Sequence, residues 1–80
     1  MNDDSSEILL AFGRNLEQIK KNKKMSYRQI AAKCDLEHSD IKRYVDGKIN
    51  PTLLSLVQLS RALDISISEL VSFDELELEN

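Results

Sequence analysis

Two short helical segments, separated by only a few residues, constrain this 80-residue chain more than any other feature. Ser26 and Gln29 have the spacing of a capping box, in which each side chain bonds a backbone N–H group that the start of a helix leaves free. The segment is predicted to continue to about Cys34. Asp35 then ends it, because a short acceptor side chain tolerates left-handed backbone better than most other residues do. A second helix is predicted over about 37–46.

The second segment has an apolar face and a polar face, as expected for a helix lying on a core. Its residues divide into an apolar and a polar set: Leu36, Ile41, Tyr44 and Val45 against His38, Ser39, Lys42 and Arg43. Gly47 stands where a left-handed C-terminal cap is expected. Two short helices joined by a tight turn, with polar residues along the second, form a helix-turn-helix.

Three further helices are predicted around this pair. One precedes it, with apolar residues at helical spacing from Ile8 to Ile19. Another starts at Thr52, with Leu53 among the residues directed to the core. A short one follows Ser66, which is predicted to form a second capping box with Glu69. The chain is therefore predicted to be all-α, a compact five-helix bundle. Its predicted parts are a flexible acidic N-terminus at 1–6, the helical domain at 7–72 and an acidic tail at 73–80.

The composition excludes several classes of function. The chain has two glycines, one histidine, one proline and no tryptophan, too few of these residues for most catalytic sites and glycine-rich phosphate-binding loops. We therefore expect no enzyme and no cofactor. The single cysteine, Cys34, excludes an internal disulfide and fits a reducing, cytoplasmic setting. Cys34 and His38 have no third or fourth ligand nearby, so no metal site is predicted. No apolar run approaches the roughly 18 residues that a membrane span needs.

The net charge of −3 conceals a basic centre. All 11 Lys and Arg residues lie within residues 8–68, where only six acidic residues occur, so this part carries +5. Because attraction to phosphate depends on local charge, the centre of the chain suits a nucleic-acid partner. The lysines at 20, 21, 23 and 24 have a second interpretation, as a solvated helix end whose charges offset the helix dipole.

The sequence resembles the lambda-repressor-like or Cro-like (XRE-type) helix-turn-helix domains. The matching runs are M-S-Y-R-Q-I-A-A-K-C-D-L at 25–36, D-I-K-R-Y-V-D-G-K-I-N-P-T at 40–52 and A-L-D-I-S-I-S-E-L at 62–70. Several separated matches in register are far more specific than a single motif. The resemblance implies a sequence-specific double-stranded DNA-binding transcriptional regulator, a repressor that acts as a homodimer on an inverted-repeat operator.

The resemblance also assigns roles to individual residues. The helix at about 37–46 would enter the major groove, where the candidate base-reading residues are His38, Ser39, Lys42 and Arg43. The candidate phosphate-binding residues are Tyr27, Arg28, Lys48 and Asn50. Surplus apolar residues in the C-terminal third predict a dimer interface that includes Leu54, Val71, Phe73 and Leu76. Without the resemblance, the polar face of the second helix would be interpreted as an ordinary solvent-facing surface.

Three residues depart from the family pattern. Tyr27 stands where Gln is usual, Asp35 replaces a turn glycine, and Val45 replaces a Glu that often pairs with an Arg. Because Lys20 occupies the position of that Arg, the buried Arg–Glu pair of many relatives is predicted to be absent. Tyr27 is still expected to bond a phosphate through its hydroxyl.

A second class of function fits the same fold. The net negative charge, Tyr27 and the leucine-bearing acidic tail at 73–80 suit a protein-interaction module, antitoxin-like or an anti-regulator. Such a module would bind a protein partner through the tail, which could add a strand to the partner's sheet.

Overall fold

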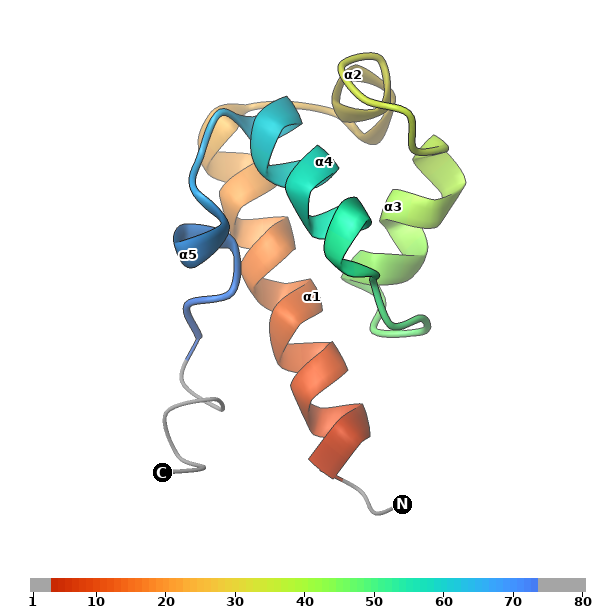
Figure 1. Cartoon of the computed structure of the whole chain (residues 1–80), viewed down its shortest axis with the longest axis vertical. Coiled ribbons are helices and arrows are strands. Elements are labelled where there is room, and N and C mark those ends of the chain that lie inside the picture. The colour runs from red at the N-terminus through yellow and green to blue at the C-terminus, as the bar shows by residue number, and fades with distance from the viewer. Residues whose placement is uncertain (1–3, 74–80) are drawn as a thin grey trace.

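The computed structural model describes residues 4–73, and this range contains five helices and no strand. The helices are α1 (Asp4–Lys23), α2 (Tyr27–Ala31), α3 (His38–Val45), α4 (Leu53–Leu63) and α5 (Ile67–Leu70). Figure 1 shows α1 running the length of the molecule, with α2 and α3 toward one side and α5 on the other. The predicted all-α, five-helix architecture is confirmed. None of these helices combines the length and apolar character that crossing a bilayer requires.

One apolar core receives side chains from all five helices. Its buried members are Phe12, Leu16, Ile30, Ile41, Tyr44, Leu59, Ala62, Leu63 and Leu70. The predicted apolar face of α1 supplies two of them, and α5, only four residues long, is anchored by Leu70. Asn15 Nδ2 also donates to the Leu70 carbonyl at 2.7 Å, which ties α5 to α1.

Both predicted capping boxes are present. Ser26 Oγ accepts from the Gln29 N–H at 3.1 Å, and Gln29 Oε1 accepts from the Ser26 N–H at 2.8 Å. Ser66 and Glu69 make the same reciprocal pair at the start of α5. Gly47 has the predicted left-handed backbone, with φ of 70°. These caps fix where the short helices begin and where α3 ends.

The structure differs from the sequence prediction of helix ends and turns in three places. Helix α1 begins at Asp4, inside the range 1–6 that was expected to be flexible. Helix α2 ends at Ala31 and not near Cys34, because the N–H groups of Lys33 and Cys34 bond carbonyls three residues back and close tight turns. Asp35 is not left-handed, since those turns need no such residue. The described non-glycine residues with positive φ are Lys24 and Asp64, at the ends of α1 and α4.

Leu53 was predicted to face the core, and this is wrong, because 70% of it is exposed. The first turn of α4 packs inward through a polar residue instead. Ser55 is buried there and bonds both Thr52, the N-cap of α4, and the hydroxyl of Tyr44. In this turn the inward residue is therefore Ser55, with its hydrogen bonds, and not Leu53 as the apolar pattern predicted.

Gly13 marks the closest approach of α1 to α3. A Cβ atom at Gly13 would lie 2.7 Å from the Tyr44 carbonyl oxygen and closer still to the Val45 carbonyl oxygen. Because both neighbours are backbone atoms, no rotation of a side chain could make room. The crossing of the two helices therefore depends on glycine at this position, and it sets the position of α3.

Candidate nucleic-acid interface

The inner face of α3 is held by buried contacts. Ile41 is fully buried, and Tyr44, predicted as a core residue, is 6% exposed. The Tyr44 hydroxyl donates to Ser55 Oγ at 3.1 Å, so the phenol is satisfied inside the protein. Helix α3 is thus fixed against α1 and α4, and only its outer face remains available to a ligand.

The turn between α2 and α3 is tied to α4 by a hydrogen bond that the sequence did not predict. The backbone N–H of Asp35 donates to Gln58 Oε1 at 2.9 Å. This contact joins residues 23 positions apart, and nothing in the sequence around Gln58 marks it as the partner of Asp35. It holds the turn of the motif against α4.

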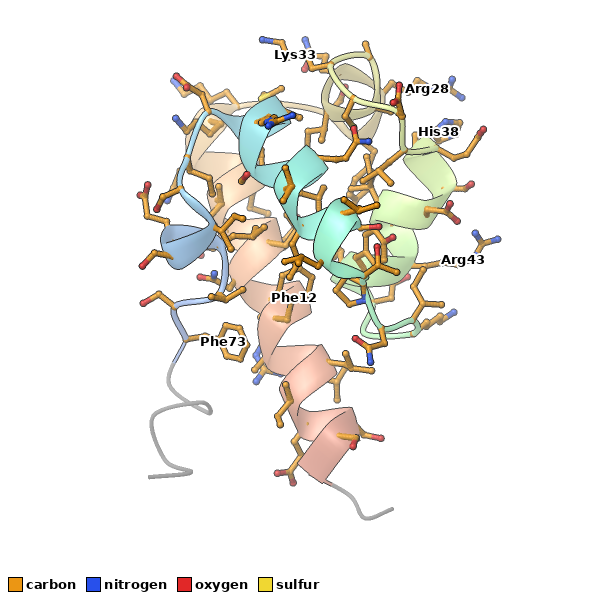
Figure 2. The ribbon with its side chains drawn as sticks, viewed as in Figure 1. Phe12, Arg28, Lys33, His38, Arg43 and Phe73 are labelled. Atoms are coloured by element: carbon orange, nitrogen blue, oxygen red, sulfur yellow. The ribbon has the colours of Figure 1, made fainter. Side chains whose placement is uncertain are left out.

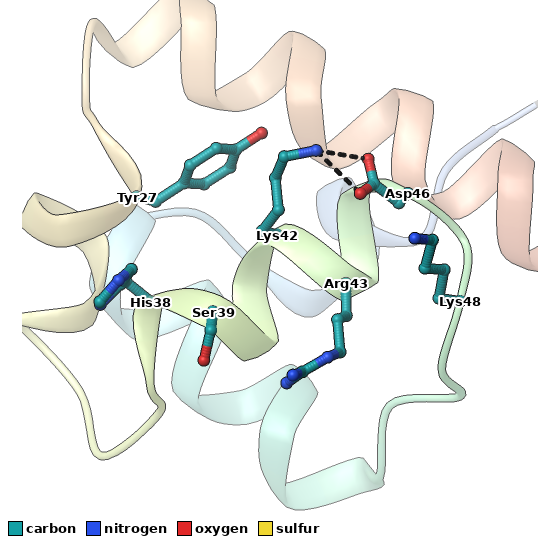
Figure 3. Close-up of a pocket in the computed structure, with 7 residues that line it drawn as sticks. All are labelled: Tyr27, His38, Ser39, Lys42, Arg43, Asp46 and Lys48. Atoms are coloured by element: carbon teal, nitrogen blue, oxygen red, sulfur yellow. Dashed lines mark hydrogen bonds and ion pairs between the residues drawn. The ribbon is translucent and has the colours of Figure 1, made fainter.

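The outer face of α3 carries all four predicted base-reading residues. His38, Ser39, Lys42 and Arg43 are exposed and line one open hollow of about 500 Å³ (Figure 3). The other residues of this hollow are Tyr27, Asp46 and Lys48. The structure thus brings together six of the eight predicted DNA-contact residues. Arg28 and Asn50 are exposed but do not line the hollow, although Figure 2 shows Arg28 on the same outer side as His38.

Both cations of α3 are paired with aspartates. Lys42 Nζ lies 2.9 and 2.8 Å from the two carboxylate oxygens of Asp46, and Arg43 Nη1 lies 2.6 Å from Asp40 Oδ1. The hydrogen bond to Asp46 raises the pKa of the Lys42 ammonium, so Lys42 remains charged. Asp40 and Asp46 had no role in the sequence prediction, although their i,i+3 and i,i+4 spacing from these cations is the signal for such pairs.

Tyr27 was expected to bond a phosphate through its hydroxyl, but that hydroxyl already has a partner within the protein. It is half-buried, and its hydroxyl lies 3.2 Å from Glu17 Oε1, while Lys20 Nζ sits 4.8 Å from the ring centroid. Burial, and then the negative charge of Glu17, raise the pKa of the Tyr27 hydroxyl, which keeps it protonated as the donor to Glu17. A phosphate would have to compete with that carboxylate. Lys20, which occupies the position of the family's Arg, serves here to join α1 to the start of α2.

The predicted dimer residues fall into three groups. Leu54 is 75% exposed, as expected for an apolar residue surplus to the core. Val71 and Phe73 are half-buried, and the Phe73 ring packs edge-on against Phe12 with centroids 6.4 Å apart, so Phe73 also serves the core. Leu76 lies outside the described residues, as do residues 74–80 of the tail to which a protein partner was assigned.

Cys34 and His38 do not form part of a metal centre within residues 4–73. No group of three or more His, Cys, Asp and Glu side chains there is placed to hold an ion. The Cys34 thiol instead lies 3.4 Å from the Ile30 carbonyl oxygen, to which it donates. This contact is that of a partly buried structural thiol.

Comparison with known proteins places the chain in a family. The helix-turn-helix family matches residues 16–70. Control protein C.MunI from a Mycoplasma species is 33% identical over 75 residues, which cover 92% of this chain and 99% of that protein. The crystal structure of the restriction-modification controller protein C.AhdI from Aeromonas hydrophila, 31% identical, matches with a TM-score of 0.75 over 78% of this chain and 94% of its own.

A more distant structure has the same fold. The hypothetical transcription factor NHTF from Neisseria is 17% identical and matches with a TM-score of 0.78, over 94% of this chain and 86% of its own. The family match covers both helices of the motif and extends from Leu16 in α1 to Leu70 in α5. This chain therefore belongs to the helix-turn-helix family, as its XRE-type sequence pattern predicted.

Proposed function

We propose that this protein is a sequence-specific double-stranded DNA-binding transcriptional regulator, without catalytic activity, that acts in the cytoplasm. The observation that carries the proposal is the outer face of α3, where four polar side chains gather on a helix fixed from behind. A helix presented in this way fits the major groove, and the early residues of such a helix meet base edges.

The names of the relatives support a role in gene control. Two relatives at least 30% identical to this chain are a control protein and a restriction-modification controller protein. We therefore extend the proposal to genes of a restriction-modification system as targets. Repression is the simplest mode of action, because a protein bound over a promoter excludes polymerase. Both names describe control proteins, which favours DNA binding over the interaction-module alternative.

The residues of the interface have separable tasks. Arg43 has the fork geometry to bond O6 and N7 of one guanine, and His38 and Ser39 offer shorter donors and acceptors beside it. Lys48, which follows α3 and lines the same hollow, is placed to bind a phosphate, as is the exposed Arg28 of α2. The exposed Asn50, in the loop before α4, is a third candidate for backbone contact.

Selection of bound duplexes from a random-sequence DNA pool tests the proposal. We expect an enriched motif with two-fold symmetry and half-sites about one helical turn, roughly 34 Å, apart. Affinity should fall with salt, and log K should drop by about 0.9 per decade of salt for each phosphate neutralised. A folded protein that enriches no motif, at physiological salt and again at lowered salt, would contradict the proposal.

The homodimer is the second part of the proposal, and Leu54 is its most direct test. Leu54→Glu should weaken self-association, because it places a charge on an apolar residue that is 75% exposed in the single chain. Sedimentation at high micromolar concentration measures the change. Gln18→Glu, an exposed change on α1, is the control and should leave the dimer intact. A wild-type protein that sediments as a monomer, with and without DNA, would refute the dimer.

A further inference from the structure

Helix α3 and its C-cap carry as many acids as cations. The cations are Lys42 and Arg43, and the acids are Asp40 and Asp46, each within hydrogen-bonding distance of one cation. The segment that the proposed function places against DNA therefore has no net charge. An aspartate so close to a phosphate backbone weakens general attraction to DNA, so its presence there calls for another role.

The two pairs differ in geometry. Asp46 holds Lys42 through both carboxylate oxygens and directs it toward the C-terminal end of α3, on the side of Lys48 (Figure 3). Asp40 holds Arg43 by a single bond, from Nη1 to Oδ1 at 2.6 Å. Arg43 leaves α3 in a different direction from Lys42 and extends away from the body of the protein (Figures 2 and 3).

The single bond leaves Arg43 able to read a base. A guanidinium has five N–H donors in a fixed plane, and one of them is bound to Asp40. The other four remain, which is enough to donate to both O6 and N7 of a guanine. The bond to Asp40 restricts the rotation of a long side chain that would otherwise sample the phosphates on either side of the groove, and it lowers the net charge that attracts those phosphates.

We infer that Asp40 is a positioning residue for sequence discrimination: it directs the guanidinium of Arg43 to one base and away from the phosphate backbone. The inference rests on the proposed function, because it needs a DNA site to discriminate. It assigns the two aspartates of α3 different tasks. Asp40 acts on specificity through Arg43, whereas Asp46 acts only through its charge and through Lys42.

The test compares Asp40→Asn with Asp46→Asn, which each remove one partly exposed carboxylate from the same segment. Motifs selected by the wild type and by Arg43→Ala first identify the base pair that Arg43 reads. Affinities are then measured for the selected duplex, for a duplex changed at that base pair, and for a scrambled duplex, at several salt concentrations. Thermal unfolding confirms that each variant is folded.

We expect Asp40→Asn to bind scrambled DNA several-fold more tightly and to lose discrimination at the Arg43 base pair by on the order of ten-fold. Asp46→Asn should strengthen binding to all three duplexes and leave discrimination at the Arg43 base pair unchanged. In an Arg43→Ala background, Asp40→Asn should leave discrimination at that base pair unchanged, because the residue through which it acts is gone.

Three outcomes would overturn the inference. If the wild type is selective and the Asp40→Asn variant discriminates equally well, Asp40 acts only as a negative charge. A loss of discrimination that persists in the Arg43→Ala background would show that Asp40 does not act through Arg43. A wild type that binds the selected and scrambled duplexes equally would overturn the proposed function as well, so the two failures are distinguishable.

Discussion

Gly13→Ala is expected to destabilise the protein by about 3 kcal/mol or more, the upper range for inserting a methyl group into a packed site. Helix propensity predicts the opposite sign, because alanine in an exposed helix interior is favoured over glycine by about 1 kcal/mol. Gly13 is buried, however, and lies in the middle of α1 where α3 crosses it. Packing and propensity thus make opposing predictions for the same substitution.

The geometry at Gly13 decides which effect is larger. The added Cβ would lie 2.7 Å from the Tyr44 carbonyl oxygen, well inside van der Waals contact, and closer still to that of Val45. Both carbonyls belong to the end of α3, which is also anchored by Ile41 and by the Tyr44–Ser55 hydrogen bond. Relief therefore requires the two helices to separate, which would loosen the whole core around them.

Thermal and urea unfolding measure the effect. For a domain of this size, 3 kcal/mol corresponds to a fall in Tm of roughly 12–24 °C, and total stability is only about 5–15 kcal/mol. Gln18→Ala is the control, since Gln18 is an exposed residue of the same helix, and it should change stability by less than about 0.5 kcal/mol. An unchanged or raised Tm for Gly13→Ala would show that α1 and α3 do not meet this closely.

The close approach at Gly13 also shows where sequence reasoning stops. Capping boxes are local chemical patterns, so Ser26 and Ser66 marked the starts of α2 and α5 correctly. Apolar periodicity likewise identified the inward positions of α1 and α3. Gly13 has no side chain to enter a periodic pattern, and its role depends on a helix about 30 residues later in the chain. The same limit applies to Gln58, whose bond to Asp35 joins distant segments.

Periodicity was wrong where a polar residue took an inward position. Ser55 is buried because Tyr44 and Thr52 supply hydrogen-bond partners, and Leu53 is exposed in consequence. Hydrophobicity alone cannot predict a buried serine whose partner comes from another helix. At the candidate site, the exposure of the four predicted base-reading residues followed from their spacing on α3. Their pairing with Asp40 and Asp46 required the side-chain geometry.

Arg43→Ala is expected to have the largest effect on function. A bidentate bond to guanine is worth ~1–3 kcal/mol of discrimination, so preference at one base pair should fall by roughly 5- to 150-fold. The substitution also leaves Asp40 without its partner. An unpaired carboxylate near phosphates opposes binding to every duplex, so affinity for the selected duplex should fall by more than the loss of discrimination alone. Titration of the selected duplex and of its single-base-pair variants measures it.

Two matched variants separate base reading from simple charge. Arg43→Lys keeps the positive charge but loses the planar fork, so it should recover general affinity without recovering discrimination. Lys48→Ala removes a cation from the same hollow and should weaken all duplexes alike, with the salt slope reduced by about 0.9. If Arg43→Ala weakens every duplex uniformly instead, Arg43 binds the backbone like Lys48. Base recognition would then rest on His38 and Ser39, whose short side chains require α3 to lie deeper in the groove.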